Sequence, residues 1–194
     1  MTDSMKADLQ RYLQAGRDAI LWKLDGLSEY NIRRPMTSTG TNLLGLVKHL
    51  TAVELGYFSW TFDRPFQERV PWAEDAAELN SDMWATPDES TEYVVGLYKK
   101  IWAQSDATIA TLPLDAAGRV PHWPEDRAHV TLHRIIVHVI ADMDRHAGHA
   151  DIVRELIDGS VGLTHGNDNM ASDDAQYWSE YRDRLEGAAR RFQR

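Results

Sequence analysis

The chain of 194 residues contains no cysteine. Disulfide bonds, thiolate zinc sites and a cysteine nucleophile are therefore excluded, so any metal ion must be held by histidine, a carboxylate or backbone oxygen. No apolar run approaches the ~18 residues that a membrane-spanning helix needs. The polar residues 1–8 also differ from a secretory signal peptide. We therefore expect a cytoplasmic protein with no membrane partner.

Positive charge is also scarce, since 21 Lys and Arg stand against 30 Asp and Glu, for a formal net charge of −9. A nucleic-acid partner is not expected, because phosphate binding needs clustered cations. The sequence has neither a glycine-rich phosphate loop nor a Gly-x-Ser-x-Gly turn. With 43% hydrophobic residues, its composition is that of a globular protein. Its length suits a single domain over residues 1–194.

Apolar residues recur along the chain at helical spacing, and strand-like alternation never persists beyond a few residues. The pattern predicts helices over residues 6–27, 42–60, 90–112 and 130–158, and an amphipathic helix over 174–192. Thr86 to Glu89 resembles a capping box with proline at the first helical position and would start the third helix, with Ser90 or Thr91 as the alternative start. Thr131 is the candidate cap of the fourth helix and Gly159 its stop. Loops are expected at 28–41, 61–90 and 113–129. We predict an all-α four-helix bundle with an additional C-terminal helix.

Four polar side chains mark one face of the fourth predicted helix: His138, Asp142, His146 and His149. Residues three or four apart lie on the same helix face. The apolar residues around them repeat at the same period, so Asp142 and His146 are expected on or beside the buried face. A buried carboxylate is costly unless a positive charge neutralises it, and a divalent metal ion would do so.

A third ligand should come from a facing helix, as in other bundle metal sites. His49 is the candidate, because Leu46 and Val53 on its own face predict that it points inward. A core histidine with a satisfied hydrogen bond, and a solvated face on the fourth helix, are the alternatives. The metal interpretation fails if the three side chains lie more than ~8 Å apart, because such ions need short ligand distances.

Residues 43–54 (LLGLVKHLTAVE) and 145–155 (RHAGHADIVRE) together resemble the DinB/YfiT superfamily of metal-binding four-helix bundles. The resemblance spans residues 5–185 and is closest to an actinobacterial branch of unknown function, related to mycothiol-dependent maleylpyruvate isomerase. It implies an up-down-down-up bundle whose metal is held by one histidine on the second helix and two residues four apart on a later helix. Those positions are His49, Asp142 and His146.

The carboxylate ligand departs from the pattern of the family. Many members have histidine at the position of Asp142, and the maleylpyruvate isomerase branch has glutamate, which is one methylene longer. Direct ligation and ligation through water therefore both stay open for Asp142, and His138 or His149 could complete the ligand set. Two histidines and one carboxylate leave open coordination positions, which is typical of catalytic zinc. Zinc is the first choice, with nickel, manganese and iron as alternatives.

The resemblance also implies a chemistry, because members transfer low-molecular-weight thiols such as mycothiol or bacillithiol to electrophiles, or isomerise a substrate with one. We expect a metal-dependent thiol S-transferase or isomerase with a small-molecule substrate and a thiol cosubstrate. His149 or Glu54 would be the catalytic acid–base group. Cationic groups for a pocket mouth are available at Arg33, Arg34, Arg145 and Arg154, although arginines near helix ends are more often ordinary surface residues.

Two other functions remain open. A hydroxide formed at the metal would make the protein a small hydrolase. Alternatively, the chain is a non-enzymatic bundle that binds a ligand or forms an oligomer such as a homodimer. Tryptophans in or beside the irregular loops could wall a pocket, form an interface or cap the bundle core; they are Trp60, Trp72, Trp84 and Trp123.

Overall fold

The computed structural model of the protein describes residues 2–74 and 76–193, and the side chains from residue 4 onward within them. By its internal contacts the chain divides into two compact units, Met1–Ser160 and Val161–Arg194. Each unit is described by itself. The expectation of one domain over residues 1–194 stays a prediction.

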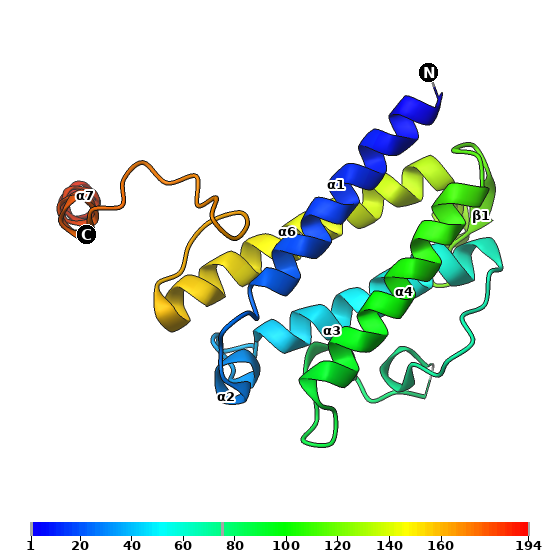
Figure 1. The fold of residues 1–194 in the computed structure, drawn as a ribbon, viewed down its shortest axis with the longest axis horizontal. Coiled ribbons are helices and arrows are strands. Elements are labelled where there is room, and N and C mark those ends of the chain that lie inside the picture. Colours follow the sequence, from blue (N-terminus) through cyan, green and yellow to red (C-terminus); the bar gives the residue numbers. More distant parts are fainter. Residues whose placement is uncertain (1, 75, 194) are drawn as a thin grey trace. The chain divides into compact units, whose positions relative to one another are not determined.

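Four long helices build the first unit: α1 (Thr2–Trp22), α3 (Leu43–Glu54), α4 (Thr91–Thr111) and α6 (Leu132–Asp158). Helix α1 packs along α6, and α3 packs against both α4 and α6. Figure 1 shows that α1 and α6 run in one direction while α3 and α4 run in the opposite one. The predicted all-α bundle in up-down-down-up order is therefore confirmed.

Local capping explains where two of these helices begin and where one ends. The Ser90 hydroxyl accepts a hydrogen bond from the amide of Tyr93 at the start of α4, so the start at the Thr86 capping box is wrong and the alternative start at Ser90 is correct. The Thr131 hydroxyl caps α6 in the same way, and Gly159 ends α6 with a φ of 79°. A left-handed residue after the last turn is the usual role of glycine at a helix end.

The first helix and the loop after it differ from the prediction. Helix α1 ends at Trp22, before residue 27, and the expected loop contains the short helix α2 (Glu29–Arg33). The Ser28 hydroxyl caps α2 by accepting a hydrogen bond from the amide of Asn31. Five residues give too short a pattern for helical periodicity to be recognised.

Helix α3 does not end cleanly but changes its winding. It continues as a π-helical turn, η1 (Leu55–Ser59), and a 3₁₀ turn, η2 (Trp60–Phe62). The amide of Trp60 donates to the carbonyls of Leu55 and Gly56. A π turn holds one more residue than an α turn and is frequent at functional sites. The predicted helical stretch to residue 60 is correct, but its last part is not α-helical.

The bundle core lies between the four long helices. Full burial of a large apolar side chain contributes about 1.5–3 kcal/mol, so this set dominates the stability of the unit. Fully buried members from all four helices include Leu13, Ile20, Leu46, Leu50, Val94, Tyr98, Ile136, Val139 and Met143.

The connections carry short elements. The first long connection contains η3 (Pro71–Ala73) and η4 (Ser81–Met83). The second contains an antiparallel pair, β1 (Ala117–Arg119) with β2 (His129–Thr131), around the short helix α5 (Glu125–Ala128). These strands are only three residues long, too short to show a recognisable alternation along the sequence, and they leave the all-α class unchanged.

The second unit contains α7 (Ala175–Arg190), which Asp174 caps and which agrees with the predicted C-terminal helix. No residue of α7 is buried, and Tyr177, Tyr181 and Leu185 are exposed on it. In the part of the chain that the structure describes, no helix is both long and apolar enough to cross a membrane.

Candidate metal centre

The structure brings the three predicted ligands together. His49 comes from α3, and Asp142 and His146 come from α6. One ligand atom from each lies within 4.8 Å of the other two. The rings of His49 and His146 meet edge to face with centroids 4.7 Å apart, and Nε2 of His146 lies 3.7 Å from Oδ1 of Asp142. All of these separations are shorter than the ~8 Å beyond which the three side chains could not share one ion.

The side chains fit a divalent ion. Ligand atoms around a tetrahedral zinc lie about 3.4 Å apart, so small side-chain adjustments would close the set. Nδ1 of His146 is buried and has no hydrogen-bond partner in the described structure, which is costly for a group with nothing to bind. Burial and the neighbouring His49 lower the pKa of His146, which favours the neutral imidazole that metals bind.

A residue that the sequence pattern does not reveal orients the first ligand. Oδ2 of Asp82 lies 2.7 Å from Nδ1 of His49. A carboxylate on one ring nitrogen fixes the tautomer and turns the other nitrogen toward an ion. Nε2 of His49 is thus left for the metal. Asp82 lies in η4, within a stretch expected only as a loop, and no spacing links it to His49.

Asp82 is held in place by a close contact between η4 and α3. The Asn42 side chain donates a hydrogen bond to the carbonyl oxygen of Met83 at 3.1 Å. A Cβ atom at Gly45 would lie 1.9 Å from the same oxygen. Only glycine at position 45 allows this approach, so Asn42 and Gly45 at the start of α3 position the carboxylate that orients His49.

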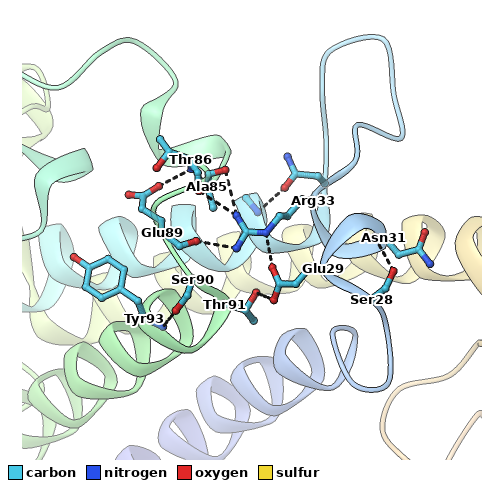
Figure 2. Close-up of polar contacts among 12 residues, drawn as sticks. Ser28, Glu29, Asn31, Arg33, Ala85, Thr86, Glu89, Ser90, Thr91 and Tyr93 are labelled. Atoms are coloured by element: carbon cyan, nitrogen blue, oxygen red, sulfur yellow. Dashed lines mark hydrogen bonds and ion pairs between the residues drawn. The ribbon is translucent and has the colours of Figure 1, made fainter.

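Arg33 fixes the segment after η4 (Figure 2). Its guanidinium donates to the carbonyl oxygens of Thr86 at 3.2 Å and Glu89 at 2.8 Å, and to the carboxylate of Glu29 at 2.6 Å. The buried ammonium of Lys48 donates to the carbonyl of Trp84 and to the carboxylate of Glu89. The sequence left open whether Arg33 serves a pocket mouth or is an ordinary surface residue; in the structure it holds this segment in place.

A pocket of about 350 Å³ opens beside the three candidate ligands. This size lies in the range of small-molecule sites. Two of the three ligands, His49 and Asp142, form part of its wall. The other residues that line it come mainly from the end of α3 and from η1: Ala52, Val53, Gly56, Tyr57, Trp60, His122 and His138.

A second polar cluster lies in the same pocket around Tyr57, on the π turn. Its hydroxyl accepts a hydrogen bond from Nε1 of Trp123 at 3.2 Å and lies 3.0 Å from Nε2 of His138. The Tyr57 and His138 rings meet edge to face with centroids 4.7 Å apart. The ring centroid of His122 lies 5.7 Å from that of Tyr57. His138 therefore has an aromatic partner of its own, outside the set of three candidate ligands.

The predicted acid–base candidates lie outside the pocket lining. Glu54 is fully buried and accepts hydrogen bonds from Arg17, with Nε of Arg17 2.8 Å from Oε1. Arg17 also pairs with the carboxylate of Asp106 at 2.8 Å. His149 is exposed, with its ring 5.4 Å from that of His146. A catalytic role for either residue stays a prediction, and the pairing of Glu54 favours a structural role.

The remaining predicted positions divide between structure and surface. Arg154 is buried and donates to the carbonyls of Lys23 and Asp25, so it ties α6 to the end of α1. Arg145 is exposed on α6. Of the tryptophans, Trp60 lines the pocket and the indole of Trp123 donates to Tyr57, whereas Trp72, which belongs to η3, is buried.

A family profile described as "MST: Mycothiol-S-transferase" matches residues 8–159, which include the candidate ligands and the pocket lining. No curated protein matches the chain.

Proposed function

Because this chain belongs to the mycothiol S-transferase family, we propose that it transfers a low-molecular-weight thiol of the mycothiol type to a small electrophile, or isomerises a substrate with one. We propose that a divalent cation, zinc first, is held by His49, Asp142 and His146. The protein supplies no thiol of its own, so the thiol arrives as a cosubstrate. The proposed location is the cytoplasm, where thiols are kept reduced.

The observation that carries the proposal is the position of the ligand set. His49 and Asp142 belong both to the set of candidate ligands and to the wall of the 350 Å³ pocket. A cation bound there would favour the thiolate form of a thiol at neutral pH. The thiol and the electrophile could then meet within one enclosure, which replaces a bimolecular encounter in water by a positioned one.

The residues of the chain have separate roles in this proposal. Asp82 holds the ring of His49 in one tautomer and one orientation. Ala52, Val53 and Trp60 supply apolar surface on which an uncharged electrophile can lie. Gly56 leaves space between that surface and the π turn, since only Trp60 lies within 4 Å of a Cβ built there.

Metal analysis tests the ligand assignment. The protein expressed in metal-replete medium without chelator should carry about one equivalent of divalent metal. His49→Ala and His146→Ala should each lose it while circular dichroism reports unchanged helical content. His133→Ala is the matched control, because His133 is an exposed histidine in the first turn of α6. Unchanged stoichiometry in both ligand variants would refute the assignment.

Thiol consumption tests the chemistry. The metal-loaded protein should join mycothiol to one or more members of an electrophile panel, with the conjugate identified by mass spectrometry. Turnover of ester or amide substrates at the same rate with and without thiol would instead identify the hydrolase. Absence of both activities from a protein with stoichiometric metal would leave the non-enzymatic bundle.

A further inference from the structure

Apart from the candidate metal ligands, the polar group of the pocket with two side-chain hydrogen-bond neighbours is the hydroxyl of Tyr57. Nε1 of Trp123 lies 3.2 Å from it and Nε2 of His138 lies 3.0 Å from it. Tyr57 itself lines the pocket and is 9% exposed. A phenolic oxygen has two acceptor positions and one proton. Two neighbours are therefore available to hold the oxygen while its proton is shared with a third group.

The indole nitrogen decides part of the hydrogen-bond pattern. Trp123 can only donate, so the Tyr57 oxygen is an acceptor in that bond. Burial lowers the pKa of His138 and raises the pKa of Tyr57, so both groups are uncharged at neutral pH. In the tautomer with a proton on Nε2, neutral His138 also donates to the Tyr57 oxygen. The phenolic proton is then free to point at a molecule in the pocket.

The pocket wall indicates what that molecule is. Neither lysine nor arginine is among the described residues that line it, and Asp142 places a carboxylate there. The charge of the proposed cation would be balanced by Asp142 and by the thiolate, and an anionic substrate group would find no lysine or arginine in the described lining to pair with. Apolar surface from Ala52, Val53 and Trp60 faces the same space. The pocket therefore fits an uncharged, partly apolar electrophile.

We propose that Tyr57 is the proton donor of the transfer reaction, and that the pocket takes uncharged electrophiles whose oxygen becomes anionic when the thiolate attacks, with epoxides as the type. The inference rests on the proposed function. Trp123 and His138 are positioning residues for Tyr57. Compounds that lose halide need no such proton and gain nothing from this group.

The step balances. A thiolate sulfur forms a bond to one ring carbon of the epoxide, and the carbon–oxygen bond breaks with its electron pair passing to oxygen. The alkoxide takes the proton of Tyr57, and the N–H groups of Trp123 and His138 both donate to the resulting phenolate. The proton released when the thiol became a thiolate returns to Tyr57 through solvent. The net reaction adds thiol to epoxide to give a hydroxy thioether.

Two electrophiles of similar size test this in the zinc-loaded protein with mycothiol, namely styrene oxide and benzyl chloride. Tyr57→Phe should lower the ratio of kcat/KM for styrene oxide to that for benzyl chloride by roughly 100-fold, the usual effect of a general acid. Tyr12→Phe, at an exposed tyrosine of α1, is the matched control and should leave the ratio unchanged. Equal losses on both electrophiles, or no loss, would overturn the inference.

A binding measurement separates this inference from the transferase activity. Equilibrium dialysis should show acetophenone, an unreactive ketone, binding about five- to tenfold more weakly to Tyr57→Phe than to the parent chain, because one hydrogen bond is lost. Ethylbenzene, which has no oxygen, should bind both equally. That pattern without any thiol transfer would support the subsite and reject the transferase. Equal acetophenone affinity would reject the subsite even in an active transferase.

Discussion

Oδ2 of Asp82 lies 2.7 Å from Nδ1 of His49, although 33 positions of sequence separate the two residues. Asp82 comes from a short 3₁₀ turn in a long connection and His49 from the middle of α3. The contact ties the least regular part of the bundle to the candidate metal centre. The connection therefore contributes directly to the site.

Removing the Asp82 carboxylate should weaken metal binding without removing a ligand. We expect Asp82→Ala to lower zinc affinity by about 10–100-fold, because the His49 ring loses its fixed tautomer and orientation. Competition with a chromogenic chelator measures the affinity. Asp88→Ala, at an exposed aspartate in the same connection, is the control and should leave it unchanged. Equal affinities in all three proteins would show that Asp82 does not act through His49.

Adding one carbon at Gly45 should disturb the same contact from the other side. In Gly45→Ala the new Cβ would lie 1.9 Å from the carbonyl oxygen of Met83, so η4 must move away from α3. We expect a loss of about 1–3 kcal/mol in the free energy of unfolding, together with weaker zinc binding. Urea unfolding and the chelator competition measure the two effects.

Gly148→Ala is the matched control for this prediction. Gly148 lies on α6 with no atom within 4 Å of a built Cβ. It should raise the free energy of unfolding by up to about 1 kcal/mol, since alanine is the better helix former. Stability losses of the same size in both variants would mean that the approach of η4 to α3 is unimportant.

The buried pair between Arg17 and Glu54 gives a prediction about the acid–base candidate. Arg17→Met should cost about 3–5 kcal/mol of unfolding free energy, because it leaves a buried carboxylate without its partner. The double change Arg17→Met with Glu54→Gln should recover part of that loss. Denaturant unfolding measures both, and Arg11→Met, at an exposed arginine, should cost little. Metal content should not change in any variant that folds.

Thiol transfer by Glu54→Gln separates the two roles of this residue. A structural Glu54 predicts a variant that is less stable but retains turnover below its melting temperature. Loss of turnover in a folded, metal-loaded variant would support the acid–base role that the sequence suggested.

Acid should weaken the end of α6 through Asp158. Hydrogen bonds from Arg154 hold the pKa of Asp158 below its usual value. Since the folded-state pKa is the lower one, the stabilisation is present above the unfolded-state pKa of about 4 and is lost as the pH falls through the folded-state value. Asp158→Asn should cost about 0.5–1 kcal/mol at pH 7 after solvent screening. The cost should shrink as the pH falls through the folded-state pKa of Asp158; a difference that stays constant down to that range would contradict the prediction.

The sequence predicted those features whose signals are local. Thr131 caps α6, and Ser90, the alternative to the Thr86 capping box, caps α4; each hydroxyl accepts a hydrogen bond from the amide three positions on. Gly159 ends α6 by its own backbone conformation. The inward direction of His49 followed from its helical neighbours. Each signal lies within about one helical turn, which is the distance over which periodicity and capping act.

The features that it did not predict depend on contacts between distant segments. Asp82 reaches His49 only because Asn42 and Gly45 admit the carbonyl of Met83. Glu54 pairs with Arg17 of another helix, and this pairing favours a structural role for a carboxylate that the sequence suggested as catalytic. Neither relationship leaves a spacing that can be recognised along the chain.

The π turn at Leu55–Ser59 has a consequence for how such a protein can change. His49 lies before the turn, whereas Trp60 lies after it. A π turn accommodates one residue more than an α-helical turn, so removing one residue would restore ordinary winding and redirect the side chains within the turn, among them the pocket residues Gly56 and Tyr57. Single-residue insertions and deletions here would thus exchange the side chains that a substrate meets and leave the cation ligands untouched. Substrate preference would then change while the candidate ligands His49, Asp142 and His146 stay the same.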